Sequence, residues 1–506
     1  MNITPGTSLV ILIAIPLVGA ALVYLIGRIS LLLKLSMPIT SGGRWLALSV
    51  LLLSVLPVIR LYPEVVRGNL VEARIGSVIL RMDGLGMLMT VMTIFLGLVV
   101  VLFSTAYVRG ERGEEKYHAG TLVMLAALIG LANAGDLFNL WVWFELMTIS
   151  SVMLVAFYRD QAGALEAGFK YLAQSAAGSA LVVLGIAMVF TVTGSLNLDS
   201  IRFIVQQGNP LLLVAGGLFL VGFGVKAALV PMHTWLPDAH SQAPSGISAL
   251  LSGIVIEAGL IALLRTLACL TDVSQIWGIL LMAFGAVNML FGNLLALRQQ
   301  QVKRMLAYSS IAQVGYMLAG FGVAFLFGNL NGAGGGYFHL VTHALMKSAA
   351  FLAAGALLYG IHLAAGHHEP LVLDDLNGAS RRYPLAALVF SMGVLGLGGL
   401  PPLAGFMSKW QIITAGFQSS NLPAALLMVF IALNSVLSLG YYAPMVNRLY
   451  RREMAPALSS AQRLPIVMTA ALVILGVLIL LLGLYPASVN WLISPAAQSL
   501  MMTLAR

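Results

Sequence analysis

Four lysines, Lys170, Lys226, Lys347 and Lys409, lie inside stretches of sequence that are otherwise apolar enough to cross a lipid bilayer. The other 23 of the 27 basic residues fall near the ends of such stretches or between them. An ammonium group at the centre of a bilayer costs on the order of 3 kcal/mol on insertion scales, so ionisable groups at that depth are rare and mark ion or substrate pathways. These lysines are therefore candidates for an ion pathway.

The composition indicates what kind of protein must position them. The chain has 506 residues, of which 60% are hydrophobic and 9% are charged, and its mean hydropathy is +0.96. This is more apolar surface than one soluble core could hide, so we expect an all-α polytopic membrane protein. Apolar runs of about 17–25 residues predict about fourteen transmembrane helices. They lie at roughly 8–27, 45–62, 84–106, 119–134, 136–157, 168–193, 211–230, 245–268, 276–297, 303–327, 336–360, 383–418, 424–447 and 465–486.

The basic residues between these runs are distributed unevenly. Sixteen fall in the odd-numbered loops and seven on the opposite face. The positive-inside rule then predicts that the odd-numbered loops are cytoplasmic and that both termini lie on the outer face of the cell's inner (plasma) membrane. Because the basic residues do not form one run, the net charge of +9 does not indicate binding to nucleic acid.

Other features narrow the chemistry. No Lys or Arg precedes Arg28, so we interpret the first apolar run as a retained helix and not as a signal peptide. The single cysteine, Cys269, excludes an internal disulfide and a cysteine-ligated iron–sulfur cluster. We expect no catalytic centre, metal or cofactor in this chain, so any redox step that drives it would take place in another subunit.

Prolines predict breaks next to two of the lysines. Pro231 cannot donate a hydrogen bond and opposes the carbonyl of Ala227, so the seventh helix should kink or break just beyond Lys226. Broken helices at membrane depth are tolerated where they line a wet cavity or pack in protein, so we expect Lys226 beside free carbonyls that water can reach. The other interpretation is a lysine that snorkels to the interface.

The twelfth helix repeats this design in reverse order. Pro401 and Pro402 interrupt it, and Lys409 follows two turns later. Two lysines beside two broken helices suggest two related halves, which is a common construction in ion transporters.

A histidine pair lies between these two helices. His339, His343 and Lys347 are spaced by four residues, so they share one face of a helix. We interpret this face as a proton relay. The alternatives are buried structural histidines and a metal site, although no Cys, Asp or Glu on that helix would complete a metal site.

Glu145 lies about nine residues into the fifth predicted helix, among aromatic residues. Its natural partner is a lysine, and we expect it to approach Lys226 in the membrane interior. At an effective dielectric constant of about 20 and a separation of roughly 8 Å, two unit charges interact by about 2 kcal/mol. A change in the charge of the carboxylate could therefore change the protonation state of the lysine. The alternative is a static ion pair, which would have the same sequence pattern.

Five stretches, at 135–145, 226–240, 302–316, 343–347 and 399–409, resemble the antiporter-like subunits of respiratory complex I. They are also similar to the D-type subunits of Mrp sodium/proton antiporters and to the large membrane subunits of membrane-bound hydrogenases. The resemblance implies two inverted five-helix repeats, helices 4–8 at 119–270 and helices 9–13 at 271–450. Helices 1–3 would precede them at 1–118, and a last helix would follow within 451–506.

The resemblance also implies roles along a hydrophilic axis at the membrane midplane. Glu145 matches the family's glutamate of the fifth helix, Lys226 its partner lysine, and Lys409 the lysine of the twelfth helix. The central relay region is matched by His339, His343 and Lys347. The family usually has a lysine where this chain has Glu257, so the local sign is reversed. We expect Glu257 to be neutral, bathed in water, or paired with a lysine such as Lys226 or Lys347.

The sequence thus predicts a proton-translocating subunit, or one that exchanges sodium for protons, within a larger membrane complex. Its expected partners are other membrane subunits, protons or sodium ions, and lipid. Two alternatives remain at this point, a self-sufficient secondary cation/proton antiporter and a membrane scaffold that does not conduct.

Overall fold

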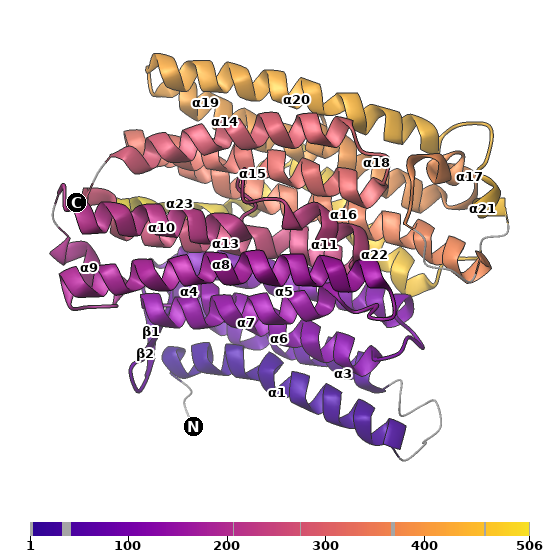
Figure 1. Ribbon diagram of the computed structural model, residues 1–506, viewed down its shortest axis with the longest axis horizontal. Helices are drawn as coiled ribbons and strands as arrows, with labels where there is room; N and C mark the ends of the chain where they lie inside the picture. Colours follow the sequence, from indigo (N-terminus) through magenta and orange to yellow (C-terminus); the bar gives the residue numbers. More distant parts are fainter. Residues whose placement is uncertain are drawn as a thin grey trace.

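The computed structural model describes residues 4–32, 42–205, 207–273, 275–365, 370–459 and 462–504. Its helices lie side by side along one direction (Figure 1), with α1 (Pro5–Leu32) at the lower edge of the view and α20 (Leu422–Leu449) at the upper edge. Figure 1 marks both ends of the chain at the left end of the bundle. The chain therefore crosses the bundle progressively from α1 to α20, so a row of side chains across it must draw on many helices.

The first half contains a hairpin of two strands, β1 (Val71–Ile75) and β2 (Val78–Met82). Its helices are α3 (Gly42–Leu53), α4 (Val55–Val66), α5 (Gly84–Tyr107), α6 (Glu114–Ala132), α7 (Leu137–Val155), α8 (Ala162–Thr193), α9 (Leu198–Ile204), α10 (Pro210–Lys226), α11 (Trp235–Gln242), α12 (Ser245–Leu250) and α13 (Ile256–Cys269). A π-helical segment, η1 (Leu251–Val255), joins α12 to α13, and a 3₁₀ turn, η2 (Thr271–Val273), follows.

The regular elements described in the second half are helices. Its other helices are α14 (Ile276–Leu297), α15 (Val302–Phe327), α16 (Leu330–Ala365), α17 (Ala379–Arg382), α18 (Pro384–Gly398), α19 (Ala404–Gln418), α21 (Pro456–Ser459), α22 (Ile466–Leu484) and α23 (Asn490–Leu504). Two 3₁₀ turns, η3 (Leu373–Leu376) and η4 (Pro486–Val489), lie between them.

The prediction of a polytopic helical membrane protein is confirmed. Within the described residues, 11 helical segments are long and apolar enough to cross a membrane, and α10 and α18 are shorter apolar helices. Each of the predicted ranges coincides with a helix or a pair of helices. The boundary between the fourth and fifth runs lies at Asp136, whose side chain caps α7 by accepting a hydrogen bond from the Asn139 backbone N–H at 2.7 Å.

Both predicted helix breaks are present. The chain leaves helical geometry after Lys226 and resumes it at Trp235, and Ala228 in this gap has a φ of 56°. The second break separates α18 from α19, and Gly399 there has a φ of 83°. This left-handed conformation is available to glycine without steric cost. Each break leaves backbone carbonyls within the bundle that need new partners.

Several elements were not predicted, among them a hairpin and two helices. The hairpin pairs Val71 with Met82 and Ile75 with Val78 in antiparallel register, so the protein is not purely helical. The short helix α9 and the C-terminal helix α23 were also missed, and α23 packs against α5 and α16. The hairpin, α9 and the end of α23 lie together at the left end of Figure 1.

The most deeply buried helices run through the middle of the bundle. The span Ser245–Cys269 is completely buried in the protein, and the neighbouring α16 and α15 are almost as enclosed. Glycine allows these helices to pack closely. A Cβ atom added to Gly253, for example, would lie only 3.2 Å from the carbonyl oxygen of Ala344. Polar side chains on these helices are shielded from lipid and bulk water, so their partners must come from within the protein.

Candidate functional site

Lys226, the last residue of α10, is enclosed by hydroxyl groups and aromatic rings. Its Nζ donates a hydrogen bond to the Tyr171 hydroxyl at 2.5 Å and lies 3.5 Å from the Ser151 hydroxyl. The ring of Tyr171 stacks on Trp235 with centroids 3.9 Å apart. Trp235 also donates its indole N–H to the carbonyl of Val225 at 2.7 Å. The helix break is therefore capped by a side chain.

This geometry corrects one expectation. We expected Lys226 beside free carbonyls that water can reach, but its side chain is completely buried and its hydrogen-bond partners are hydroxyl groups. The cause is the turn at 227–234, which brings Trp235 back over the end of α10 and occupies the carbonyl that the lysine would have used.

Glu145 lies on α7 beside this cage. It follows Phe144, whose ring centre is 5.9 Å from Lys226 Nζ, and Glu145 acts electrostatically on Lys226. Both residues belong to the described part of the chain, and they make no ion pair within 4 Å. Oε1 of Glu145 is buried without a hydrogen-bond partner. The static ion pair considered above is therefore not formed, while an electrostatic coupling at longer range remains.

Glu257 is bound by a histidine. Its Oε1 lies 2.7 Å from Nδ1 of His343, and both side chains are completely buried. The expected lysine partners, Lys226 and Lys347, are thus wrong for this carboxylate. Glu257 lies two residues beyond the end of the π-helical segment η1, and such segments occur frequently at functional sites. The outer atoms of the pair, Glu257 Oε2 and His343 Nε2, are buried and unpartnered.

His339 continues the row along α16. Its ring centre is 6.4 Å from that of His343. Nδ1 lies 2.9 Å from the Ser408 hydroxyl and Nε2 lies 3.0 Å from Oε1 of Gln313. The predicted shared face of the histidines therefore points into the protein, where both rings are completely buried.

Lys347 lies two turns beyond His339 on the same helix. Its Nζ donates to the backbone carbonyl of Leu306 at 2.6 Å and to the Ser309 hydroxyl. The lysine is completely buried, and among the described residues no carboxylate forms an ion pair with it.

Lys409 occupies the second helix break. Its Nζ donates to the carbonyl of Leu397 at 2.7 Å and to the Ser435 hydroxyl at 2.9 Å. The amide of Gln313 donates to the same Leu397 carbonyl at 3.1 Å. Because Gln313 also bonds to His339, one glutamine and one carbonyl connect the histidine to the lysine. The break that Pro401 and Pro402 predict thus provides the acceptor.

We call the seven residues Glu145, Lys226, Glu257, His343, His339, Lys347 and Lys409 the polar axis. They come from α7, α10, α13, α16 and α19, and these helices follow one another across the bundle in Figure 1. The packing of α10 on α13, of α12 and η1 on α16, and of α16 on α19 joins them. The row therefore runs across the helices and not along one of them.

Lys170 is the exception among the four lysines. Its side chain is 45% exposed, and it pairs with Glu166 at 2.7 Å and with Asp238 at 3.1 Å. The apolarity of its segment is a property of the lipid-facing surface of α8, which carries exposed Leu165 and Phe169. Lys170 is therefore not a member of the polar axis.

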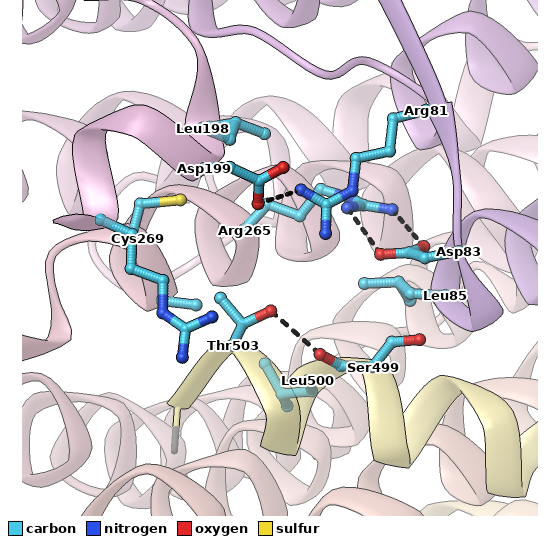
Figure 2. A pocket seen from close by; sticks show the side chains of 12 residues that line it. Arg81, Asp83, Leu85, Leu198, Asp199, Arg265, Cys269, Ser499, Leu500 and Thr503 are labelled. Carbon is cyan, nitrogen blue, oxygen red and sulfur yellow. Dashed lines mark hydrogen bonds and ion pairs between the residues drawn. The ribbon is translucent and has the colours of Figure 1, made fainter. Parts of the chain in front are cut away.

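A second polar cluster, which the sequence did not predict, lies where the hairpin meets α13 (Figure 2). Arg265 makes two hydrogen bonds to Asp83, at 2.8 and 3.1 Å, and a third to the carbonyl of Ala132. Arg81 pairs with Asp199 across the same cavity, whose volume is about 30 Å³. Burial alone would raise the pKa of Asp83, but Arg265 holds it below its ordinary value.

The described residues hold no group of three or more His, Cys, Asp or Glu side chains placed to bind a metal ion. The polar axis instead offers amines, imidazoles and carboxylates. Such groups can take up and release protons, and the lysines and histidines are held by neutral donors or acceptors or by the one histidine–carboxylate contact.

Residues 134–438 match the family model described as NADH:quinone oxidoreductase/Mrp antiporter, TM. The chain belongs to this family. The matched range contains all seven residues of the polar axis and both helix breaks. The protein is thus an antiporter-like membrane subunit of the NADH:quinone oxidoreductase/Mrp family.

Individual family members agree with this assignment. F(420)H(2) dehydrogenase subunit N of Methanosarcina mazei is 33% identical over 429 residues, which is 83% of this chain and 84% of the relative. Hydrogenase-4 component B of Escherichia coli is 32% identical over 82% of this chain but only 63% of its own length. A chain of the membrane-bound sulfane sulfur reductase, an archaeal respiratory membrane complex, has a TM-score of 0.85 at 28% identity, with 98% of each chain covered.

The sequence did not single out several residues that complete the site. Tyr171 and Gln313 bond directly to members of the polar axis, and Lys303 and His240 are buried next to it. Gln313 and Lys303 fall within the family-like stretch 302–316, and His240 ends the stretch 226–240. The sequence signal for these residues was that each is a polar residue within a family-like stretch. That signal was not sufficient, because a polar residue near the end of an apolar segment usually faces water.

Proposed function

We propose that this protein translocates protons along the polar axis as a subunit of a multisubunit membrane complex. The observation that carries this proposal is a buried row of titratable groups with two hydrogen-bonded sections. One section joins Glu257 to His343, and the other runs from His339 through Gln313 and the Leu397 carbonyl to Lys409.

The bonding of the lysines favours transport over a static role. Lys226, Lys347 and Lys409 are held by hydroxyl groups and backbone carbonyls, and none of them forms an ion pair within the described residues. A buried charge without a counter-ion is costly. The charge state of Lys226 is therefore sensitive to whether the neighbouring Glu145 is ionised, and this sensitivity is what a proton-transfer chain requires.

The Glu145 and Lys226 pair supplies the switch in this proposal. Glu145 acts on Lys226 without a direct ion pair, so a change in the charge of Glu145 alters the electrostatic energy of the lysine.

The Glu257 and His343 pair supplies the central transfer step. A protonated histidine donates its Nδ1–H to the carboxylate, whereas a protonated glutamate donates to the bare Nδ1 of a neutral ring that keeps its proton on Nε2. The contact at 2.7 Å serves both arrangements. One proton can therefore be held on either side of the pair.

The relatives support the expectation of partner subunits, since one is a dehydrogenase subunit, one is a hydrogenase component and one is part of a respiratory membrane complex. In this proposal the driving reaction takes place in those partners, and exchange of sodium for protons is the alternative ion chemistry. The odd-numbered loops face the cytoplasm, and the host membrane is the plasma membrane.

The test uses the purified complex that contains this chain, reconstituted into liposomes with a pH-sensitive dye and energised by the reaction of the complex. Glu145→Gln, which keeps the shape and removes the titration, should lower proton movement at least about tenfold. Glu166→Gln is the matched control, because that glutamate is 66% exposed. Wild-type proton movement in Glu145→Gln would overturn the proposal.

Two further measurements separate the alternatives. The chain alone in liposomes should not exchange ions when a pH gradient is imposed, whereas robust exchange without partners would indicate a self-sufficient antiporter. Uptake of radioactive sodium by the complex should be absent if protons are the transported ion. Sodium uptake that Glu145→Gln abolishes would indicate sodium/proton exchange.

A further inference from the structure

His240 is a buried histidine that the polar axis does not include. It lies on α11, the short helix after the first break, and its ring stacks on Phe351 with centroids 4.7 Å apart. Its exposed fraction is zero, and both ring nitrogens are buried without a hydrogen-bond partner. Phe351 fixes the plane of the ring but satisfies neither nitrogen. A structural histidine would normally have at least one nitrogen bonded.

Two lysines flank this ring. Phe351 follows Lys347 by one turn of α16, so the ring that stacks on His240 lies next to the axis lysine. On the other side, Lys303 of α15 donates its Nζ to the carbonyl of Ala243, three residues after His240. Lys303 and Lys347 both act electrostatically on His240. The imidazole therefore lies within the influence of two amines.

Lys303 connects this region to the end of the bundle. It is the second residue of α15, and the preceding loop contains exposed Arg298 and Gln300. The Lys303 side chain is itself buried, with 6% of its surface exposed. Lys303 and His240 therefore lie between this loop and Lys347.

Ion pairs hold α11 in place at that end. Asp238 bonds to Arg304 of α15 at 2.6 Å and to Lys170 of α8 at 3.1 Å. These two contacts fix the helix that carries His240 against both of its neighbours. Lys170, which is not on the polar axis, thus has a positioning role at the end of the bundle.

We infer that His240 is a proton-transfer residue that joins Lys303, and through it the odd-numbered loops, to Lys347 of the polar axis. In one cycle, one ring nitrogen accepts a proton from the ammonium group of Lys303, and the other nitrogen releases a proton to the amine of Lys347. Rotation or a reverse tautomer shift resets the ring, so one proton moves and no other group is consumed. This inference rests on the proposed function, because it supplies the polar axis with an intake route.

The first test replaces His240 by glutamine in the complete complex. His240→Gln should lower proton movement in liposomes at least about tenfold. His118→Gln is the matched control, because His118 is also buried with both nitrogens unpartnered but lies on α6, away from the axis. It should retain wild-type proton movement. Full activity of His240→Gln beside an inactive Glu145→Gln would overturn the inference and leave the proposed function intact.

The second test separates proton transfer from packing. In His240→Ala, added imidazole fills the space left by the ring and can carry protons, whereas pyrazole fills the same space but is far less basic. Recovery of proton movement with imidazole alone supports the inference. Equal recovery with both compounds, or with neither in a complex that is assembled, contradicts it. If both His240→Gln and Glu145→Gln transport normally, the proposed function itself is wrong.

Discussion

Oε1 of Glu257 lies 2.7 Å from Nδ1 of His343 in a region where neither side chain reaches solvent. This contact replaces the lysine pairing that the sequence suggested. It places a carboxyl group and an imidazole, which can each take up and release a proton, face to face within the bundle, and each has an outer atom without a hydrogen-bond partner.

Glu257→Gln should impair proton transport at least about tenfold while leaving the subunit assembled. Glutamine can still accept a hydrogen bond from His343, but it cannot take up a proton. The measurement is proton movement by the reconstituted complex across the pH range. Wild-type transport at every pH would show that Glu257 is a tolerated structural group.

Lys409→Ala should abolish transport with little effect on assembly, because the lysine is the last titratable member of the row and its hydrogen bonds go to the Leu397 carbonyl and the Ser435 hydroxyl. Lys116→Ala is the control, since this lysine is exposed near an end of the bundle. It should keep most of the activity. The same loss in both variants would mean that the position of Lys409 on the row is irrelevant.

Tyr171→Phe should slow transport and leave the fold intact. The substitution removes the hydroxyl that binds Lys226 at 2.5 Å and Ser151 at 2.8 Å, but it keeps the ring stacked on Trp235. The melting temperature of the purified complex should therefore change little. A variant that is fully active would show that the hydroxyl does not take part in the switch.

Asp83→Asn should destabilise the protein by about 3 kcal/mol, since it leaves the Arg265 guanidinium buried without its counter-ion. The pKa of Asp83 is lowered in the folded protein from its ordinary value of 3.8, so its stabilisation is complete above that value and is lost as the pH falls through the lower, folded-state pKa.

Thermal melting at several pH values checks this prediction. The difference between wild type and Asp83→Asn should be constant at pH values well above 3.8 and should shrink in more acidic buffers. Asp160→Asn, at an exposed position, is the control. A difference that does not depend on pH in the acidic range would contradict the role of the carboxylate charge.

The sequence predicted the features that depend on local chemistry. Pro231 and Pro402 forecast the helix breaks because proline lacks a backbone donor, and the period of the helix placed His339 and His343 on one face. The Gly76–Ser77 pair between two short β-prone runs is a hairpin signal. The hairpin was not predicted because the long apolar runs on either side of it dominate the sequence pattern.

The features that depend on tertiary packing could not be predicted. Lys170 and Lys226 lie in equally apolar stretches, yet one faces outward and the other inward, and the local sequence does not say which face of a helix meets lipid. The partner of Glu257 is 86 residues away in the chain. It depends on how α13 packs against α16, so only the folded structure identifies His343.

The most direct test of the polar axis is the number of protons moved per turnover of the driving reaction. Lys226→Met removes the amine at the first helix break, whereas Lys116→Met removes an exposed amine near an end of the bundle. With the driving reaction still active, the count should fall in the complex that carries Lys226→Met and stay at the wild-type value with Lys116→Met. An unchanged count in Lys226→Met, at normal turnover and assembly, would contradict proton transport through this subunit.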